Sequence, residues 1–382
     1  MADLINYLTS IRFGFGSAGD LSSELEAQGI RCPLFVTDKG IVAAGLLKRT
    51  VATNGITSPI VFDETPPNPT DTAAAAALRV YRDRNCDGIV ALGGGSPIDL
   101  AKAVALMVHH HEPLVRYAVI EGGLARIVHE FPPLIAIPTT AGTGSEVGRG
   151  AIISFKDGRK LGLISPKMIP TVAICDPELT LGLPPLQTAA TGMDALTHCI
   201  ETYLSPRFNP TAEAIALDGL RRAAHNIEIA FRDGTNRQAR QEMMIAALHG
   251  GMTFQKGLGS VHALSHPLGG LKSVSLHHGT LNAVLLPIVL RLCEGAAPEK
   301  SAVLREVLGV APGASLANYV SDLNKKLELP STLGELGVSL DVVPAIAEAA
   351  MLDHSHASNV RPMSLHEYRA ILTEAITGKP VF

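Results

Sequence analysis

Residues 88–107 carry the pattern that decides the fold: Gly88-Ile-Val-Ala-Leu92, then Gly93-Gly-Gly-Ser96, then Pro97-Ile-Asp-Leu-Ala-Lys-Ala-Val-Ala-Leu-Met107. The first part is a short apolar run typical of a buried strand. Ser96 is a suitable N-cap and Pro97 fits a first helical turn, so the third part predicts a helix. The glycines between them let backbone amides approach a ligand, and the helix start offers unpaired N–H groups to a phosphate. Because the glycines depart from the G-x-G-x-x-G fingerprint, a plain tight turn is the alternative.

A second junction of the same kind follows. Leu134-Ile-Ala-Ile-Pro138 resembles a strand, and Thr139-Thr-Ala-Gly-Thr-Gly-Ser-Glu146 is a turn rich in hydroxyls and glycine. Earlier in the chain, residues 32–37 and 60–62 are short apolar runs, and residues 71–84 form an alanine-rich helical stretch. Such repeats predict a mostly parallel sheet with helices on both faces, which binds ligands at the carboxyl ends of its strands. Two such turns together favour a dinucleotide pyrophosphate over a plain turn.

Size and composition limit the class of protein. A chain of 382 residues, 46% hydrophobic and 18% charged, fits two ordinary globular domains. The formal charge of −4 gives no reason to expect nucleic acid or an anionic membrane as partner. The five cysteines form no C-x-x-C, the first residues do not resemble a signal peptide, and we expect no apolar run long enough to cross a bilayer. These observations predict a cytoplasmic protein with neither nucleic acid nor a membrane as partner.

The pattern changes near Pro184, after which strand signals become scarce. Helical periods follow at residues 187–203, 210–231, 238–254, 259–267 and 279–292. We therefore expect two domains: an α/β dinucleotide-binding domain over residues 1–183 and a helical, metal-binding and catalytic domain over residues 184–382.

The helical half contains residues suited to bind a metal. Asp194 and His198 are four residues apart, as are His262 and His266, and His277-His278-Gly279 follows. Residues four apart lie on one face of a helix, so each pair can point at a common centre. A carboxylate with several imidazoles is a ligand set for a divalent metal such as Fe(II) or Zn(II).

Four segments together resemble the iron-containing alcohol dehydrogenases: Gly93-Gly-Gly-Ser96, Pro138-Thr-Thr-Ala-Gly-Thr-Gly-Ser-Glu146, Gly192-Met-Asp-Ala-Leu-Thr-His198 and His262-Ala-Leu-Ser-His-Pro-Leu-Gly269. They follow the order and spacing of that family over essentially the whole chain. The resemblance implies a Rossmann-like α/β domain followed by an all-α domain, the two-domain plan also found in dehydroquinate synthase. It further implies an NAD-linked alcohol dehydrogenase with one divalent metal, Fe(II) or Zn(II), that assembles at least as a homodimer.

By that resemblance, the metal ligands are Asp194, His198, His262 and one of His277 and His278. The last ligand of the family precedes a glycine, which favours His278. The chain is slightly longer than many relatives just before this pair, so His277 stays an alternative.

Two other histidine groups need separate interpretations. The family places the equivalent of His266 beside the nicotinamide, so we expect a proton-relay or positioning role, with a fifth ligand or a packing residue as alternatives. The run His109-His110-His111 lies far from any carboxylate cluster in the sequence, and we expect it to be solvated.

The choice of cofactor depends on Asp38, which follows the first predicted strand. An acidic side chain there accepts a hydrogen bond from a ribose hydroxyl and repels a 2′-phosphate, so NAD is favoured over NADP, although Lys39 could weaken the repulsion. The resemblance implies three further groups of cofactor contacts: Gly94, Gly95, Ser96 and Asp99 at the pyrophosphate, Thr139, Thr140 and Thr143 on the opposite wall, and Lys160, for which a surface lysine is the alternative.

Segments beyond the shared motifs resemble the branch of the family that acts on 4-hydroxybutyrate: Phe62-Asp-Glu-Thr-Pro, Ile120-Glu-Gly-Gly, Arg149-Gly-Ala-Ile152, Gly158-Arg-Lys-Leu-Gly162, Phe254-Gln-Lys-Gly-Leu-Gly259 and Leu276-His-His-Gly-Thr-Leu-Asn-Ala283. This resemblance implies interconversion of 4-hydroxybutyrate and succinate semialdehyde. The substrate carboxylate then needs a cation, for which Arg149 is the leading candidate and Lys256 and Lys272 are alternatives.

Other activities stay open. A dehydrogenase for a neutral short-chain alcohol or diol, of the lactaldehyde or 1,3-propanediol type, is the nearest alternative. A maleylacetate-type reductase works without a metal, and the complete set of Asp and His residues disfavours it. A lyase of the dehydroquinate synthase type needs more Lys and Arg side chains than the segments around Asp194 and His262 supply.

Overall fold

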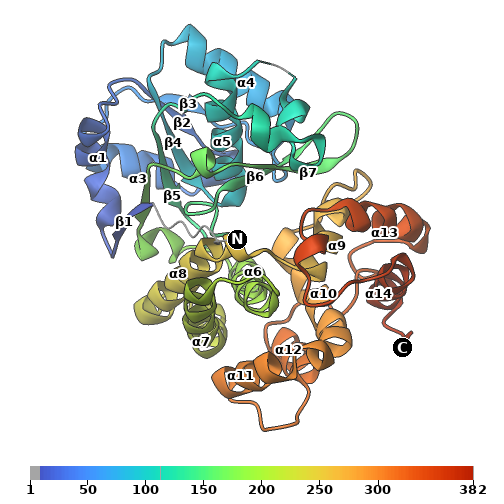
Figure 1. Cartoon of the computed structure of the whole chain (residues 1–382). Helices are drawn as coiled ribbons and strands as arrows, with labels where there is room; N and C mark the ends of the chain where they lie inside the picture. Colours follow the sequence, from blue (N-terminus) through green and yellow to red (C-terminus); the bar gives the residue numbers. More distant parts are fainter. Residues whose placement is uncertain (1–8, 112, 382) are drawn as a thin grey trace. The chain divides into compact units, whose positions relative to one another are not determined.

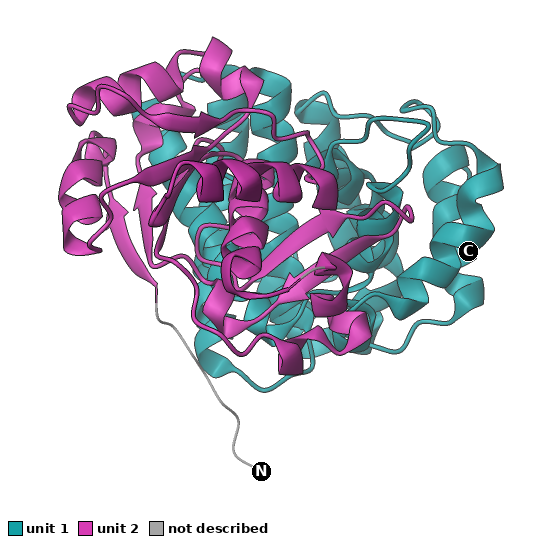
Figure 2. Ribbon diagram, turned by 90° about the horizontal axis from the view of Figure 1, so that it is seen from above, with its two compact units in different colours: residues 1–6, 141–143, 183–382 teal, residues 7–140, 144–182 magenta. Residues whose placement is uncertain are grey.

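The structure, a computed structural model, describes residues 9–111 and 113–381, and these form two compact units (Figure 2). The α/β unit comprises described residues 9–140 and 144–182, and the helical unit comprises residues 141–143 and 183–381. The division at residue 183 lies next to the expected domain boundary. Residues 141–143, in the middle of the second glycine- and hydroxyl-rich turn, group with the helical unit.

The α/β unit is built on a six-stranded sheet whose paired strands all run parallel (Figure 1). In spatial order the strands are β1 (Ser10–Phe13), β8 (Val172–Cys175), β5 (Leu134–Pro138), β4 (Gly88–Gly93), β2 (Pro33–Val36) and β3 (Ile60–Phe62). Gly93 at the end of β4 is in register with Pro138 at the end of β5. The two predicted ligand-binding turns therefore begin side by side.

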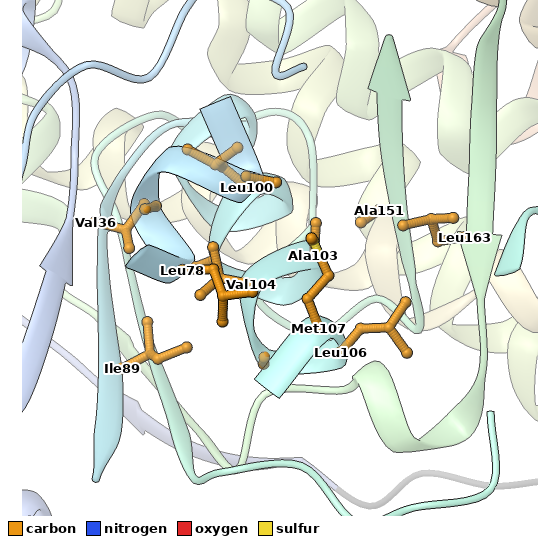
Figure 3. Packing of buried hydrophobic residues seen from close by; sticks show 14 of the residues in the cluster. Val36, Leu78, Ile89, Leu100, Ala103, Val104, Leu106, Met107, Ala151 and Leu163 are labelled. Atoms are coloured by element: carbon orange, nitrogen blue, oxygen red, sulfur yellow. The ribbon is translucent and has the colours of Figure 1, made fainter. Parts of the chain in front are cut away.

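Helices cover both faces of this sheet, as expected of parallel strands. They are α1 (Leu21–Ala27), α2 (Lys39–Ala43), α3 (Leu46–Thr53), α4 (Asp71–Asp83) and α5 (Gly95–His109). Alternate residues of β4 enter different cores. Ile89 lies in one core with Leu78 of α4 and Val104 of α5 (Figure 3), whereas Val90 belongs to a second core that includes Val51 of α3. The period of two along a strand thus gives the sheet two apolar faces, each buried under its own helices.

The start of α5 differs from the sequence prediction. The N-cap residue is Gly94 in extended conformation, and the helix begins at Gly95, so Ser96 already lies in the first turn. Its hydroxyl donates to the carbonyl oxygen of Pro67 at 2.5 Å. The chain turns earlier because Gly93 adopts a φ of 154°, where a Cβ would lie 2.6 Å from Cγ of Pro97. The expectation that Ser96 caps the helix was wrong.

The expectation of a solvated histidine run was also wrong for one of its members. His110 is buried after the end of α5, where its Nδ1 donates to the carbonyl oxygen of Leu106 at 2.9 Å. Its Nε2 accepts hydrogen bonds from the backbone N–H groups of Val128 and His129, both at 3.2 Å. Burial lowers the pKa of this imidazole, so it serves as a neutral connector between α5 and the following loop.

A two-stranded antiparallel hairpin completes the α/β unit. It consists of β6 (Gly150–Ser154) and β7 (Lys160–Ile164), with Gly150 opposite Ile164 and Ser154 opposite Lys160. Ala151 and Leu163 of this hairpin pack into the same core as α5 (Figure 3). The hairpin thus carries Arg149, the residue just before β6, and Lys160, the first residue of β7.

The helical unit contains α6 (Pro185–Leu204), α7 (Pro210–Arg232), α8 (Arg237–Met252), α9 (Ser260–Leu268), α10 (His278–Cys293), α11 (Pro298–Leu308), α12 (Leu316–Lys326), α13 (Val343–Leu352) and α14 (Leu365–Thr377) (Figure 1). Helix α6 packs against α7, α8 and α10, and α9 packs against α10 and α13. Because α6 is buried from Thr188 to Leu204, it forms the core of this unit.

Within the described part of the chain, one helical segment, His278–Ala296, is long and apolar enough to cross a membrane by length and composition. This corrects the expectation that no apolar run approaches that length. The segment is mostly buried inside the helical unit, as is typical of the core helix of a globular protein.

Candidate active site

Three helices of the helical unit bring together Asp194 and His198 from α6, His262 from α9 and His278 from α10. These four residues, here called the donor set, each offer a ligand atom, and all four atoms lie within 4.8 Å of one another. Oδ1 of Asp194 is 3.4 Å from Nε2 of His198, 3.8 Å from Nε2 of His262 and 3.7 Å from Nε2 of His278. Four ligands arranged tetrahedrally about 2.1 Å from an ion would be about 3.4 Å apart. The donor set therefore fits Fe(II) or Zn(II) with little rearrangement.

Helix packing explains why these side chains meet. Asp194 and His198 are one turn apart on α6, and His278 is the first residue of α10. The next residue, Gly279, lies so close to α6 that a Cβ there would be 2.0 Å from the carbonyl oxygen of Ala190. Only glycine permits this approach, which brings His278 to Asp194. His277, the other candidate for the fourth ligand, precedes the helix and is exposed.

A buried carboxylate orients one of the ligands. Nδ1 of His262 donates to Oε2 of Glu201 at 2.6 Å, and Oε1 of Glu201 accepts from the backbone N–H of Val261 at 2.7 Å. Because Nδ1 carries the proton, Nε2 is left to bind an ion, a common arrangement around metal-bound histidines. The sequence prediction missed Glu201, although Asp194, His198 and Glu201 follow the i, i+4, i+7 spacing of one helix face.

The electrostatics of the donor set suit a cation. Burial raises the pKa of the Asp194 carboxyl, but the imidazoles of His198, His278 and His262 outweigh this effect and hold that pKa well below its usual value. Burial lowers the pKa of His198 to about 4. Burial also acts to lower the pKa of His262, but the carboxylates of Asp194 and Glu201 raise it to about 9. The carboxylates of Asp194 and Glu201 thus stabilise positive charge next to His262.

His266 lies beside the donor set but belongs to a different group. Its Nδ1 donates to Oδ2 of Asp353 at 2.9 Å, and its ring stacks on His278 with centroids 5.6 Å apart and on His354 at 5.3 Å. Its nearest carboxylate is therefore Asp353 rather than the ligand Asp194, an arrangement that supports a relay or positioning role. The sequence prediction did not include Asp353. Burial acts to raise the pKa of its carboxyl, but His266 and His354 outweigh this effect and hold that pKa below its usual range.

Of the two alternative substrate anchors in this unit, Lys256 does not suit the role. Lys256 is buried, and its Nζ donates to the carbonyl oxygens of Thr202 at 3.0 Å, Tyr203 at 3.2 Å and Ser205. It therefore caps the carboxyl end of α6, and proposing it as an anchor was wrong. Lys272 is exposed in the loop before α10.

In the α/β unit, the two expected ligand-binding turns meet at the ends of β4 and β5. The backbone N–H of Thr139 donates to the carbonyl oxygen of Gly93 at 3.0 Å. A Cβ on Gly94 would lie 3.3 Å from the Thr140 side chain, and Gly95 opens the fifteen-residue helix α5. Gly94, Gly95, Thr139 and Thr140 are therefore brought together, whereas Thr143 groups with the helical unit.

The side chains of Asp38 and Lys160 both form hydrogen bonds within the α/β unit. Oδ1 of Asp38 accepts from the backbone N–H of Ile41 at 2.9 Å and so caps α2 directly after β2. Nζ of Lys160 donates to Oδ1 of Asn68 at 2.7 Å, one residue after the Pro67 carbonyl that binds Ser96. One loop thus connects Lys160 with the start of α5.

Asp99 and Lys102 connect α5 to the hairpin. The carboxylate of Asp99 accepts from the hydroxyl of Ser145 at 2.6 Å and from the backbone N–H of Ile152 at 2.9 Å, so both its oxygens bind groups of the protein itself. Nζ of Lys102 donates to the carbonyl oxygens of Gly148 at 2.7 Å and Gly150 at 2.8 Å. These contacts fix the backbone on both sides of Arg149.

Comparison with known proteins agrees with this geometry. Residues 9–177 match the model of the iron-containing alcohol dehydrogenases, and residues 188–376 match the C-terminal domain of the same family. The chain belongs to the iron-containing alcohol dehydrogenase family. It is 52% identical to 4-hydroxybutyrate dehydrogenase of Cupriavidus necator, over 97% of this chain and 99% of that protein.

Solved structures of two other oxidoreductases are similar to this chain. A 1,3-propanediol oxidoreductase matches with a TM-score of 0.91 and 37% identity, over 98% of this chain and all of the other. Sulfoacetaldehyde reductase from Bifidobacterium kashiwanohense, solved with NAD+, matches with a TM-score of 0.87 and 27% identity, over 99% of this chain and all of the other. The two-domain fold expected from the sequence is thereby confirmed, and the chain is an alcohol dehydrogenase.

Proposed function

We propose that the chain is a metal-dependent, NAD-linked dehydrogenase that interconverts 4-hydroxybutyrate and succinate semialdehyde. The observation that carries this proposal is the 52% identity, over nearly the full length of both chains, to the 4-hydroxybutyrate dehydrogenase of C. necator. In this proposal the enzyme works in the cytoplasm as a homodimer or larger homo-oligomer, and sheet-edge strand β1 is a candidate contact between subunits.

The donor set would hold the metal, Fe(II) or Zn(II). When bound, such an ion supplies Lewis acidity, which lowers the pKa of an alcohol and polarises an aldehyde carbonyl. Glu201 keeps Nε2 of His262 directed at the donor set. His266, whose Nδ1 is bonded to Asp353, keeps its Nε2 to hold or transfer the proton that the alcohol loses.

The turns after β4 and β5 would bind the pyrophosphate of NAD. The backbone N–H groups at the start of α5 suit a phosphate, since they are unpaired within the helix and lie at its positive end. Around this helix start lie Gly94, Gly95, Ser96, Thr139 and Thr140. In the proposal Asp99 contributes by holding the first turns of α5 against Ser145 and Ile152. Thr143 and Lys160 would add further contacts to the cofactor. The carboxylate of Asp38 would meet the adenosine ribose and disfavour a 2′-phosphate.

Arg149 would bind the substrate carboxylate. It is half-buried, and the carbonyls on both sides of it are held by Lys102, so its backbone position is fixed before a ligand arrives. A guanidinium can pair with a carboxylate through two parallel hydrogen bonds, which selects acids over neutral alcohols of similar length.

The test is succinate semialdehyde-dependent NADH oxidation by the iron(II)-reconstituted protein, compared with propanal and lactaldehyde and with a chelated control. We expect a higher kcat/KM for the semialdehyde and loss of activity on chelation. Arg149→Ala should raise KM for the semialdehyde far more than for propanal. Arg159→Ala, which removes an exposed arginine of the same hairpin paired with Asp157 and Glu121, is the matched control.

A dehydrogenase for a neutral diol is the second candidate, favoured by the likeness to 1,3-propanediol oxidoreductase. Preference for lactaldehyde or propanal over the semialdehyde would support it and would remove the role given to Arg149. Activity that survives complete metal removal would instead indicate a maleylacetate-type reductase.

A further inference from the structure

Asn282 lies one helical turn after His278 in α10, fully buried beside the donor set. Its Nδ2 donates to Oδ1 of Asp194 at 2.7 Å, and lies 3.2 Å from Nε2 of His262 and 3.3 Å from Nε2 of His278. One amide group therefore contacts three of the four ligand atoms. By comparison, Glu201 contacts one member of the donor set, His262, with its carboxylate.

The other atom of the same amide is the informative one. Oδ1 of Asn282 is buried and has no hydrogen-bond partner among the described residues. Buried acceptors are normally paired, so an unpaired one next to a ligand set requires a reason. Nδ2 is a donor and suits the lone pairs of the ligand atoms, whereas Oδ1 is an acceptor and suits a cation. A half-turn of the amide about the Cβ–Cγ bond exchanges the two atoms.

We propose that Asn282 is a fifth member of the metal site, whose amide turns its oxygen towards the bound cation. The inference rests on the metal dependence in the proposed function and is independent of the substrate. It assigns Asn282 a part in metal affinity, in addition to the packing that any buried residue of α10 provides.

Two substitutions give opposite expectations. Asn282→Leu keeps a similar volume but removes both amide atoms, so the cation loses the oxygen that faces it. Asn282→Asp replaces the amide by a carboxylate of nearly the same shape and adds negative charge towards the cation. We expect the Leu variant to bind metal about tenfold or more weakly, the range known for residues that support metal ligands, and the Asp variant to bind more tightly than the wild type.

Asn324 offers a matched control in the same unit. It is a buried asparagine of α12 whose Nδ2 donates to the backbone carbonyl of Ala283 at 2.6 Å and whose Oδ1 is likewise buried without a partner among the described residues. Asn324→Leu therefore removes an equivalent buried amide that touches the backbone of α10 but none of the four ligands. It should lower the melting temperature and leave metal affinity unchanged.

The experiment measures Zn(II) affinity of the full-length protein by competition with a chelator, and the absorption spectrum of the Co(II)-loaded protein. The expected order of affinity is Asn282→Asp, wild type, then Asn282→Leu, with Asn324→Leu equal to the wild type and an altered cobalt spectrum only in the Asn282 variants. Equal Zn(II) affinity of wild type and Asn282→Leu would overturn the proposal and leave Asn282 a packing residue. If the Leu variant does not fold, an Asp variant that binds Zn(II) no more tightly than the wild type overturns it as well.

The outcome does not depend on which aldehyde the enzyme prefers. A protein that reduces propanal better than succinate semialdehyde loses the proposed substrate but retains the expected order of metal affinities. The two proposals therefore fail separately.

Discussion

Buried carboxylates in the two units differ in the direction of their pKa shifts, and this difference distinguishes a metal site from a purely structural carboxylate. Asp194 in the helical unit and Glu146 in the α/β unit are each only 2% exposed. Burial raises the pKa of Glu146 to about 7, and the nearby Lys102 only partly opposes this. For Asp194, the surrounding imidazoles outweigh burial and hold the pKa well below its usual value.

A further carboxylate in each unit, Asp99 and Asp353, shows the same contrast. Burial raises the pKa of Asp99, which braces the hairpin, despite Lys102 and the donors from Ile152 and Ser145. The pKa of Asp353 is lowered by His266 and His354, against the effect of burial. A buried carboxylate alone therefore does not indicate a metal site. A carboxylate kept charged by several imidazoles does, because that environment suits an added cation.

The strongest test of this contrast removes the charge of the donor set. Asp194→Asn keeps the shape of the side chain but loses the anionic ligand, so we expect loss of bound metal and a fall in kcat/KM of about a thousandfold or more, since a metal supplies several kcal/mol of charge stabilisation. Metal content by elemental analysis and steady-state kinetics check this. Full metal occupancy in the variant would contradict the assignment of Asp194.

A smaller loss is expected one step away from the ligands. Glu201→Gln replaces the acceptor that fixes Nδ1–H of His262, which should weaken metal affinity by about 10- to 100-fold. Chelator competition measures it. The control is Glu213→Gln, a glutamate of the same unit paired with Lys256 and Lys300, which should leave affinity unchanged.

The next substitution tests the histidine pair beside the donor set. Asp353→Asn weakens the acceptor that orients His266, so we expect kcat to fall by about tenfold while metal content stays constant. The loss should be smaller than the roughly 10²- to 10⁴-fold effect of a general acid or base, because His266 itself is retained. A shifted pH profile of kcat should accompany the loss. Equal kcat in variant and wild type would show that His266 needs no such orientation.

The smallest effect on catalysis is expected in the α/β unit. In the folded protein the pKa of Glu146 is about 7, above the ordinary 4.5, so the folded state binds its proton more tightly and stability falls as pH rises from 4.5 to 7. Glu146→Gln should remove this dependence and stabilise the protein by about 1–3 kcal/mol above pH 7. Melting curves from about pH 5 to pH 8 check the prediction, and parallel pH dependences of variant and wild type would refute it.

The sequence predicted those features that depend on neighbours along the chain. Apolar runs and glycines located the strands β4 and β5 and their turns, and the spacing of Asp194 and His198 indicated one face of a helix. What it missed depends on contacts distant in sequence. Glu201 binds His262, 61 residues away, and Asp353 binds His266, 87 residues away.

Other misses have local causes that require coordinates. His110 differs from its exposed neighbours His109 and His111 because its ring is buried and accepts hydrogen bonds from backbone N–H groups of the following loop. Ser96 has the right chemistry for a cap, but the φ of Gly93 starts the helix earlier. No propensity of a single residue distinguishes these cases.

Gly279 has a consequence for protein engineering. Because a Cβ at this position would collide with the Ala190 carbonyl, the separation of α6 and α10 depends on a residue whose side chain offers no metal ligand. Grafting Asp194, His198, His262 and His278 onto another helical bundle would reproduce the ligands without their spacing. A transplant of this centre must include Gly279 and the segment of α6 around Ala190, because the close approach of these two backbones sets the distance between the ligands.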